Sequence, residues 1–581
     1  ERFSGVKNDE RYPINAINWI LKTNQIKTSQ LNKVCFISKV WVPTYHLTRH
    51  YTKFSISDYV REQTNVWYPR IFKKSKTSFV SEFSNKLDIH QYPGPKFWKP
   101  IIKKYIKKND YVQNRSSPEE GKKIRIDIVK KHLRIDEKKI TFIDHSTGHA
   151  NYAFFGSPNK NEDKLVLTLD AFGDYINYTA QTFKFKKNKY EIKRITSGSN
   201  FIIGRLYRYI TLILGMKPNE HEYKVMGLAP YCKPEYFKDV LSIFNKFQKV
   251  KGLKFKDFNR PKDLYFSIKK LIDSKRFDAI AGALQKYTEE LIEGWVLNCI
   301  KKTKIKNVCL AGGVAMNVKA NLVLSKLKNL NNIYIPPSPD DASQAMGACY
   351  AYYLNYFNTN NKTAIKPTHL QNSYLGYNVN LDEVKHKLKK FKKKKFIIKS
   401  ANVNTIAAKL INSGKIIGRV CGKAEFGARA LGNRSILANP KDPDVKKKIN
   451  EKVKNRDFWM PFAASVLEKY AKKYFKVKET EAYCYMTNCL ETTDLGKKSL
   501  KSAIHPYDTT CRPQILKKNT NPEYEDLVNK FGKESGVYAL LNTSFNIHGQ
   551  PISNTVEDAL KVFFKTDLDA LILPGHIIIK K

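Results

Sequence analysis

The amino-acid sequence predicts an α/β fold arranged in two units. Between Ile140 and Tyr356, short apolar runs of strand length alternate with longer stretches of helical character. The same alternation resumes at Ser373 and continues to the last residue. The polar segment Asn358–Thr363 lies between the two, and its composition is typical of a linker. We therefore expect an N-terminal unit of residues 1–357, a linker of residues 358–372 and a C-terminal unit of residues 373–581.

Individual elements follow from the same patterns. Short apolar runs predict strands; they are Leu165–Leu169, Asn307–Leu310, Phe396–Ile398, Ile416–Val420 and Val537–Leu541. Longer runs predict helices over Ala279–Lys301 and Ala342–Tyr356. Residues 36–139 show no clean periodicity, and we interpret them as an elaboration on the core whose structure the sequence leaves open.

The composition excludes several classes of protein. Of the 581 residues, 42% are hydrophobic, which is enough for real cores and excludes a wholly disordered chain. No run of about eighteen apolar residues occurs, so we expect no membrane-spanning helix. No secretory signal is visible, and the nine scattered cysteines form no CxxC pair. These features predict a cytoplasmic protein with reduced thiols.

The formal net charge of +51 would attract polyanions such as nucleic acid or an anionic membrane. Lysine, however, is abundant along the whole chain, whereas a dedicated nucleic-acid surface is usually more local and richer in arginine. We interpret the charge as solvated surface and compositional bias, and expect no specific nucleic-acid partner.

Two histidines, His145 and His149, stand four residues apart. If they open a helix, both imidazoles project from one face and can share a metal ion. An isolated HxxxH pair is equally compatible with a structural role. Asp170 strengthens the metal interpretation, because it ends an apolar run and α/β folds place ligand groups at that end of a strand.

Two loops that precede predicted helices are further candidates. Gly312 and Gly313 follow a predicted strand, and their lack of side chains would let the backbone approach a phosphate or a sugar. Asp341 lies in the second loop, where its carboxylate could cap the next helix or bind a metal ion. Each of these signals is weak by itself.

Basic residues gather beside glycines in the C-terminal unit. Lys423 and Arg429 fall within the segment Gly422–Ser435, and a guanidinium group fits phosphate oxygens as a fork. Asn542 follows a predicted strand, and its amide could bind a planar carbamoyl or amide group. The other members of this group are Lys454, Arg456 and Arg512. The pattern predicts a phosphate or oxyanion site.

Six blocks of sequence together resemble the O-carbamoyltransferases of the nodulation-factor and antibiotic-tailoring family. They run in the family's order and cover nearly the whole chain outside Phe36–Lys139. The blocks are Glu1–Asp9, His145–Pro158, Glu220–Tyr231, Leu310–Asn317, Glu425–Pro440 and Leu540–Ile552.

The resemblance implies a fold and an activity. The N-terminal domain would have the actin-like ATPase fold of the tRNA threonylcarbamoyl transferase, and the C-terminal domain would be YrdC-like. The second domain would combine carbamoyl phosphate and ATP, with Mg²⁺, into carbamoyl-adenylate. The intermediate would pass internally to the first domain, where a divalent metal ion, preferably iron, assists carbamoyl transfer to a hydroxyl of a small-molecule or glycan acceptor. A homodimer would be compatible with the family.

The resemblance also assigns residues to roles. It implies metal ligation by His145, His149 and Asp341, with Asp170 as a further ligand or as the base near the acceptor. It implies catalytic roles for His145, Asp170, Arg429 and Arg512. Nucleotide contacts in the first domain would come from Asn317 beside Gly312 and Gly313, and from Lys7. Contacts to carbamoyl phosphate and ATP in the second domain would come from Lys423, Arg429, Lys454, Arg512 and Asn542.

The sequence departs from the family pattern in three places. Lys423 and Ala428 stand where the family usually has Arg and Pro, and Ser343 replaces a usual Gly. The family's first strand, with its Gly/His/Asp-bearing loop, is absent before Glu1, which we interpret as a truncated sequence. Two alternatives remain open at this point: a threonylcarbamoyl-type tRNA-modifying enzyme, and a basic binding protein of the same fold without catalysis.

Overall fold

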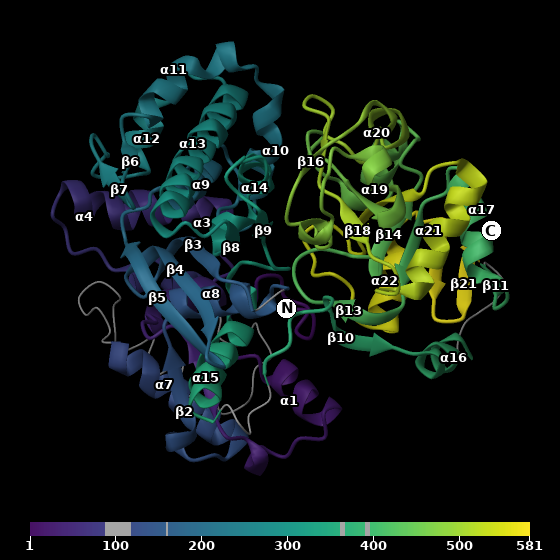
Figure 1. The fold of residues 1–581 in the computed structure, drawn as a ribbon, viewed down its shortest axis with the longest axis horizontal. Coiled ribbons are helices and arrows are strands. Elements are labelled where there is room, and N and C mark those ends of the chain that lie inside the picture. The colour runs from purple at the N-terminus through teal and green to yellow at the C-terminus, as the bar shows by residue number, and fades with distance from the viewer. Residues whose placement is uncertain (88–117, 159–160, 361–365, 390–395) are drawn as a thin grey trace.

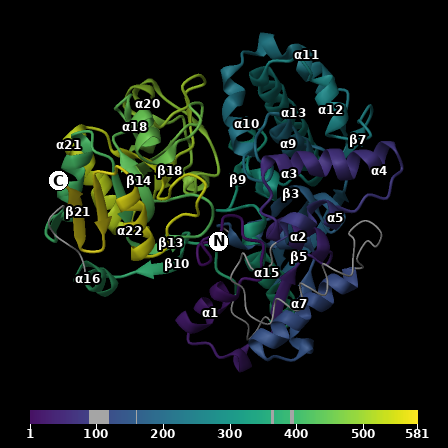
Figure 2. The same ribbon diagram turned by 180° about the vertical axis from the view of Figure 1, so that it is seen from behind.

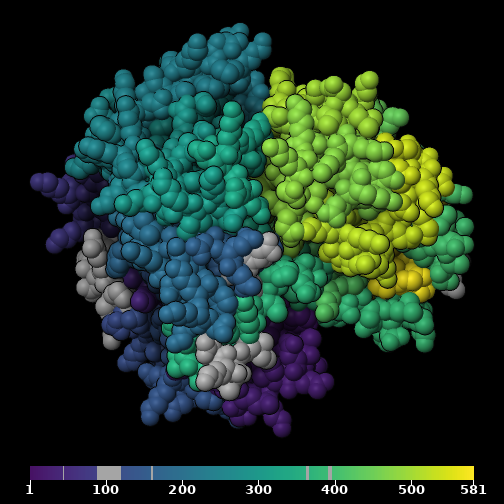
Figure 3. Space-filling model, viewed as in Figure 1, coloured from purple at the N-terminus to yellow at the C-terminus, as the bar shows by residue number. Residues whose placement is uncertain are grey.

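The computed structural model describes residues 1–87, 118–158, 161–360, 366–389 and 396–581. Two α/β units lie side by side, and the N-terminus lies between them (Figure 1). The expected α/β class is confirmed. Figure 3 shows the two units in contact along their facing sides.

A five-stranded mixed sheet forms the centre of the N-terminal unit, in the order β5-β4-β3-β8-β9. β3 pairs antiparallel with β4 and parallel with β8, so the sheet changes direction at β3. The strands are β3 (Lys164–Gly173), β4 (Ile176–Lys186), β5 (Lys189–Gly198), β8 (Asn307–Ala311) and β9 (Asn332–Tyr334). The predicted strands Leu165–Leu169 and Asn307–Leu310 are therefore confirmed.

Alternating side chains of β3 face opposite layers of helices. Leu165, Leu167 and Leu169 enter one core, and Val166 enters the other, as the period of two in a strand requires. The first layer contains α9 (Ile203–Ile213), α10 (Glu222–Leu228), α11 (Pro234–Phe244), α13 (Phe277–Thr303) and α14 (Val318–Ser325). The second contains α8 (His145–Gly156) and α15 (Gln344–Thr359). α13 and α15 confirm both predicted helices, and α15 extends into the segment expected to be a linker, of which residues 361–365 lie outside the described part.

The described part of residues 36–139, whose structure the sequence left open, is largely helical. Its elements are β1 (Val34–Ile37), α2 (Pro43–Tyr51), α3 (Ile56–Arg61), a π-helical turn (Glu62–Trp67), α4 (Tyr68–Phe72), α5 (Phe79–Phe83) and α7 (Pro118–Leu133). Helices this short give no long repeat for a sequence pattern to show. Phe54, Phe79 and Phe83 bury their rings against Leu212 of α9, and Figure 2 shows α3 beside that helix.

An eight-stranded mixed sheet forms the C-terminal unit, in the order β11-β21-β20-β12-β14-β19-β15-β18. Ile417 and Leu437 face one core, whereas Ile436 and Ala438 face the other. The strands are β11 (Phe396–Lys399), β12 (Ile417–Val420), β14 (Arg434–Ala438), β15 (Ala463–Leu467), β18 (Gln514–Leu516), β19 (Ala539–Ser544), β20 (Ala570–Leu573) and β21 (His576–Lys580). The three strands predicted here are confirmed within two residues at their starts.

Helices cover both faces of this sheet. One face carries α17 (Val403–Asn412), α19 (Glu468–Tyr474) and α21 (Pro522–Ser535), and the other carries α16 (Leu381–Lys389), α18 (Val445–Ile449) and α22 (Val556–Lys565). No helix in the described ranges is both long and apolar enough to cross a bilayer.

The two units share a buried contact. Leu431, Ala463 and Met486 of the C-terminal unit pack in the same apolar cluster as Ala150 and Phe154 of α8. At the edge of this contact, Lys224 pairs with Asp457 across the units at 2.8 Å, and the ring of His505 contacts the carbonyl oxygen of Gly227 at 3.0 Å. The shared core fixes the relative position of the loops that face each other between the units.

Candidate active site

One cavity of about 2150 Å³ lies between the two units and is lined by both. We call it the central cavity. Side chains of two charged groups line its wall. The His/Asp cluster of the N-terminal unit consists of His145, His149, Asp170 and Asp341, and all of these except the fully buried His149 line the cavity. The arginine cluster of the C-terminal unit consists of Arg429, Arg456 and Arg512.

The two histidines are placed by the start of α8. Asp144 caps this helix by accepting a hydrogen bond from the backbone N–H of Thr147 at 3.0 Å. Because the helix begins at His145, residues 145 and 149 occupy the same face one turn apart, as the sequence predicted. Asp174 accepts a hydrogen bond from the backbone N–H of His145 at 2.9 Å and so fixes the helix start.

The two carboxylates come from separate elements. Asp170 lies within β3, which continues to Gly173 past an irregularity in its pairing with β4 after Leu169. The strand therefore does not end at Asp170, as we expected from the end of the apolar run. Asp341 opens the short turn Asp341–Ser343 that leads into α15.

The four ligand atoms lie within 4.8 Å of one another. The Nε2 atoms of His145 and His149 are 2.9 and 3.1 Å from Oδ2 of Asp170, and 3.4 and 3.2 Å from Oδ1 of Asp341. Both imidazoles and Asp170 are largely enclosed, whereas the Asp341 side chain is 73% exposed. The structure thus brings together the three residues that the resemblance implied as metal ligands and Asp170, which it implied as a further ligand or as the base.

The carboxylates make this cluster attractive to a cation. Burial alone would lower the pKa of His149, but hydrogen bonds to Asp170 and Asp341 raise it to about 9. The same carboxylates raise the pKa of His145 against burial. Burial would raise the pKa of Asp170, yet its contacts with the two imidazoles hold that pKa well below its usual range. Two imidazole nitrogens and two carboxylate oxygens form a donor set that suits a divalent transition-metal ion.

The helices that carry the ligands touch through their backbones. A Cβ atom at Gly347 of α15 would lie 2.0 Å from the carbonyl oxygen of Gly148 on α8. Only glycine permits this approach. Ser38, just after β1, contacts Nδ1 of His145 at 3.1 Å and completes the support of that ring.

The arginine cluster is built from loops that lead into strands of the eight-stranded sheet. Arg429 precedes β14, Arg456 precedes β15 and Arg512 precedes β18. Burial lowers the pKa of Arg429 to about 9, and the nearby charge of Arg512 adds to this shift. The pKa of Arg456 is also lowered, first by burial and then by Arg512. In the described part of the chain, no carboxylate forms an ion pair with any of the three.

The charge of Asp340 acts on Arg429 without forming an ion pair, so positive charge stays in excess and the three cations suit an anion. The sequence had grouped these arginines, and the resemblance had assigned roles to Arg429 and Arg512 only. The structure adds Arg456 to these two on the cavity wall.

Comparison with known proteins now decides the family. The profile for the carbamoyltransferase N-terminus matches residues 1–350, and the profile for the carbamoyltransferase C-terminus matches residues 408–581. The chain belongs to the carbamoyltransferase family. Nodulation protein NolNO of Sinorhizobium fredii is 33% identical over 77% of this chain and 65% of its own length.

The chain is also similar in sequence to an archaeal protein and, remotely, in structure to a solved protein. An uncharacterized protein of Methanocaldococcus jannaschii is 30% identical over 90% of this chain and 87% of its own. Among solved structures, HypF of T. kodakarensis has a TM-score of 0.25 at 12% identity, over 45% of this chain and 44% of its own, which is too remote to carry an argument.

Within this carbamoyltransferase, the structure gives Gly312 a structural role. Its φ angle is 97°, and a Cβ atom there would lie 2.2 Å from the carbonyl oxygen of Leu169. Gly313 lines the central cavity, where an added Cβ would come within 3.1 Å of Oδ1 of Asp170. Gly312 therefore packs against the backbone of β3, and Gly313 packs against Asp170 of the His/Asp cluster.

Two predicted nucleotide contacts also line the central cavity. Asn317 caps α14, and its amide contacts Tyr207 at 3.3 Å and Gln285 at 2.9 Å, so both ends of its side chain are engaged. Lys7 reaches the cavity from the N-terminal segment and lies 3.6 Å from Glu220.

The remaining predicted residues of the C-terminal unit lie in different places. Asn542 of β19 lines the central cavity and donates to Ser465 at 2.9 Å, while its Oδ1 has no hydrogen-bond partner among the described residues. Lys454 is buried, and its ammonium group donates to Ser544 and Asn546 instead of facing the cavity. Lys423 is exposed and is not among the residues that line it.

Gln344 is a residue that sequence reasoning missed. It opens α15, is 1% exposed, and places its side-chain amide inside the His/Asp cluster. Its spacing of three residues from Asp341 was the available signal, because residues i and i+3 share a helix face.

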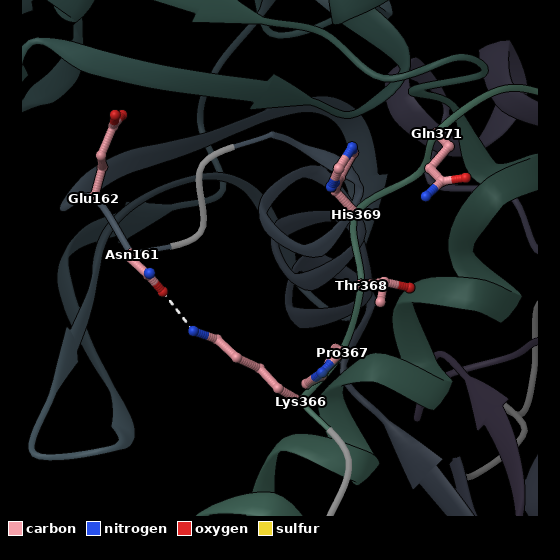
Figure 4. Close-up of a pocket in the computed structure, with 7 residues that line it drawn as sticks. All are labelled: Asn161, Glu162, Lys366, Pro367, Thr368, His369 and Gln371. Atoms are coloured by element: carbon pink, nitrogen blue, oxygen red, sulfur yellow. Dashed lines mark hydrogen bonds between the residues drawn. The ribbon is translucent and has the colours of Figure 1, made fainter. Parts of the chain in front are cut away.

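A second cavity of about 410 Å³ lies away from both clusters. Figure 4 shows its lining, with Lys366 in contact with Asn161. Its lining residues are Asn161, Glu162, Lys366, Pro367, Thr368, His369 and Gln371. It contains none of the side chains discussed above.

Proposed function

We propose that this carbamoyltransferase is an ATP-dependent O-carbamoyltransferase with two reaction centres. At the arginine cluster, carbamoyl phosphate, ATP and water would give carbamoyl-adenylate, pyrophosphate and phosphate. At the His/Asp cluster, a hydroxyl of the acceptor would take the carbamoyl group and AMP would leave. The observation that carries the proposal is the central cavity, which both clusters line.

The arginine cluster supports the first step. Its three guanidinium groups have no ion-pair partners in the described structure, so phosphate groups would supply the missing negative charge. Asn542 lies on the same cavity wall with a buried, unpartnered Oδ1. A carbamoyl NH₂ group is a donor that matches this acceptor. In this proposal the arginine cluster binds the phosphate groups and Asn542 binds the carbamoyl group. ATP would enter the site as its Mg²⁺ complex.

The His/Asp cluster supports the second step. Its donor set fits iron, zinc or manganese, and iron is the ion that we propose. When bound, such an ion would supply positive charge beside the phosphate of the departing AMP. The low pKa of Asp170 favours a role as ligand over a role as base, because a carboxylate that resists protonation accepts a proton poorly.

The acceptor side of the central cavity is aromatic. Trp41, Tyr45 and Trp67 line it from the helical region before α7. Aromatic rings offer flat apolar faces, and Tyr and Trp add a polar group at the edge. We propose that this wall receives a sugar-like or other small-molecule acceptor bearing the hydroxyl. The family assignment favours carbamoyl transfer over the threonylcarbamoyl and non-catalytic alternatives.

The test needs no acceptor. The purified protein is incubated with MgATP, and pyrophosphate release is measured with and without carbamoyl phosphate. We expect release that depends on carbamoyl phosphate and that disappears in Arg512→Ala. A matched control is Arg134→Ala, because Arg134 lies outside the central cavity. Absence of carbamoyl-phosphate-dependent release from the folded protein would refute the adenylate step.

A further inference from the structure

We infer that the side-chain oxygen of Gln344 is an additional ligand of the metal ion held by the His/Asp cluster. This inference rests on the metal site proposed above and adds a fifth protein ligand to it. It concerns the binding of the ion and can be tested without any acceptor.

The position of the Gln344 amide carries the inference. Its terminal nitrogen lies 2.6 Å from Nε2 of His149, 2.9 Å from Nε2 of His145 and 2.8 Å from Oδ1 of Asp341. These three atoms are themselves proposed ligands. An ion bonded to all of them at about 2.0–2.2 Å must therefore adjoin the end of the Gln344 side chain.

The chemistry of an amide decides which end faces the ion. The NH₂ end carries only donor hydrogens, which a cation repels, whereas the carbonyl oxygen is an acceptor and a ligand for hard cations. The two ends have nearly the same shape, so a half-turn of the terminal amide exchanges them without moving the rest of the side chain. Once a cation is present, the oxygen is the end that lowers the energy.

The local structure holds the side chain in this place. Gln344 is 1% exposed and lies on the first turn of α15, directly after the turn that holds Asp341. The contact of Gly347 with Gly148 fixes α15 against α8. A neutral ligand also suits the charge balance, since the two carboxylates already match a divalent ion.

Two substitutions separate ligation from other roles. Gln344→Leu fills a similar volume but removes the oxygen, whereas Gln344→Glu keeps an oxygen and removes the N–H donors. Binding is measured by titrating the metal-free protein with Mn²⁺ and following free Mn²⁺ by electron paramagnetic resonance. His149→Ala identifies signal from other sites. Gln181→Leu, at a buried glutamine of β4 outside the central cavity, is the control.

We expect Gln344→Leu to weaken Mn²⁺ binding by at least about 10-fold, a loss within the range that even outer-sphere partners produce. Gln344→Glu should bind Mn²⁺ at least as tightly as the unaltered protein, and Gln181→Leu should match it. Equal weakening in both Gln344 variants would show that the amide acts through its N–H groups and would overturn the inference. So would unchanged binding in Gln344→Leu. If the unaltered protein binds no Mn²⁺ that depends on His149, the proposed metal site itself fails, which is a distinguishable result.

Discussion

The His/Asp cluster and the arginine cluster face one cavity but are built in opposite ways. The first gathers two carboxylates around two imidazoles, and three of its four members come from α8 and β3. The second gathers three cations from loops before strands, without a carboxylate partner in the described ranges. The carboxylates of the first cluster hold the two imidazoles and would do the same for a metal ion, whereas the guanidinium groups of the second repel one another. We therefore propose that the first is completed by a cation and the second by an anion.

Removing one member of the arginine cluster should give the largest effect. We expect Arg456→Ala to slow carbamoyl-phosphate-dependent pyrophosphate release by roughly 100- to 1000-fold, the loss typical of removing one preorganised donor. The three cations repel one another, so the melting temperature of the ligand-free protein should not fall. Initial rates of pyrophosphate release test the first outcome, and thermal unfolding of the ligand-free protein tests the second. A lower melting temperature together with lost activity would make Arg456 a structural residue.

Removing one member of the His/Asp cluster should affect the other step. His149→Ala should lower carbamoyl transfer by more than about 100-fold, because loss of an outer-sphere partner alone costs up to that much. Pyrophosphate release should remain largely intact, since His149 lies in the other unit. Labelled carbamoyl phosphate and a panel of hydroxyl-bearing sugars allow both steps to be followed. Equal loss of both would contradict two separate centres.

Lys454 tests whether the arginine cluster depends on cations that face the central cavity. It lies two residues before Arg456 but does not line that cavity. Its ammonium group donates to Ser544, the last residue of the strand that carries Asn542, and to Asn546 just beyond it. Lys454→Met removes the buried ammonium donor of these partly buried oxygens, and we expect a loss of about 1–3 kcal/mol in the free energy of unfolding. Urea unfolding measures it. An unchanged midpoint with lost pyrophosphate release would instead place Lys454 in the anion site.

The smallest effect is expected at Lys423. This side chain is exposed and does not line the central cavity. Lys423→Ala should change pyrophosphate release by no more than about twofold, as for most surface substitutions. Steady-state rates at several ATP concentrations provide the test. A large rise in KM for ATP would show that Lys423 reaches the nucleotide after all.

Sequence patterns predicted the cores well and the outer regions poorly. Strands such as β3 and helices such as α13 were found because each presents a long, uniform apolar pattern. The short helices between β1 and α7 were missed because none is long enough to repeat a pattern. The assignments of the two units to the actin-like and YrdC-like folds stay predictions.

The candidate site divides in the same way. The spacing of His145 and His149 was enough to place both on one helix face, because the helix geometry is fixed. For Lys454 and Lys423 the sequence showed a basic residue near a family position, but not the direction of its side chain. Gln344 was missed although it stands three residues after Asp341, because this spacing gains meaning only when the histidines beside it in space are known.

The contact between Gly148 and Gly347 has a consequence for how this enzyme can vary. The two helices that carry His145, His149 and Gln344 are spaced by a backbone contact with no side chain in between. A single methyl group added at Gly347 would act as a spacer and would push Gln344 and the adjoining Asp341 away from the two histidines of α8. Binding of an ion at the proposed metal site therefore depends on a glycine that does not touch the ion, and a survey of ligands alone would overlook it.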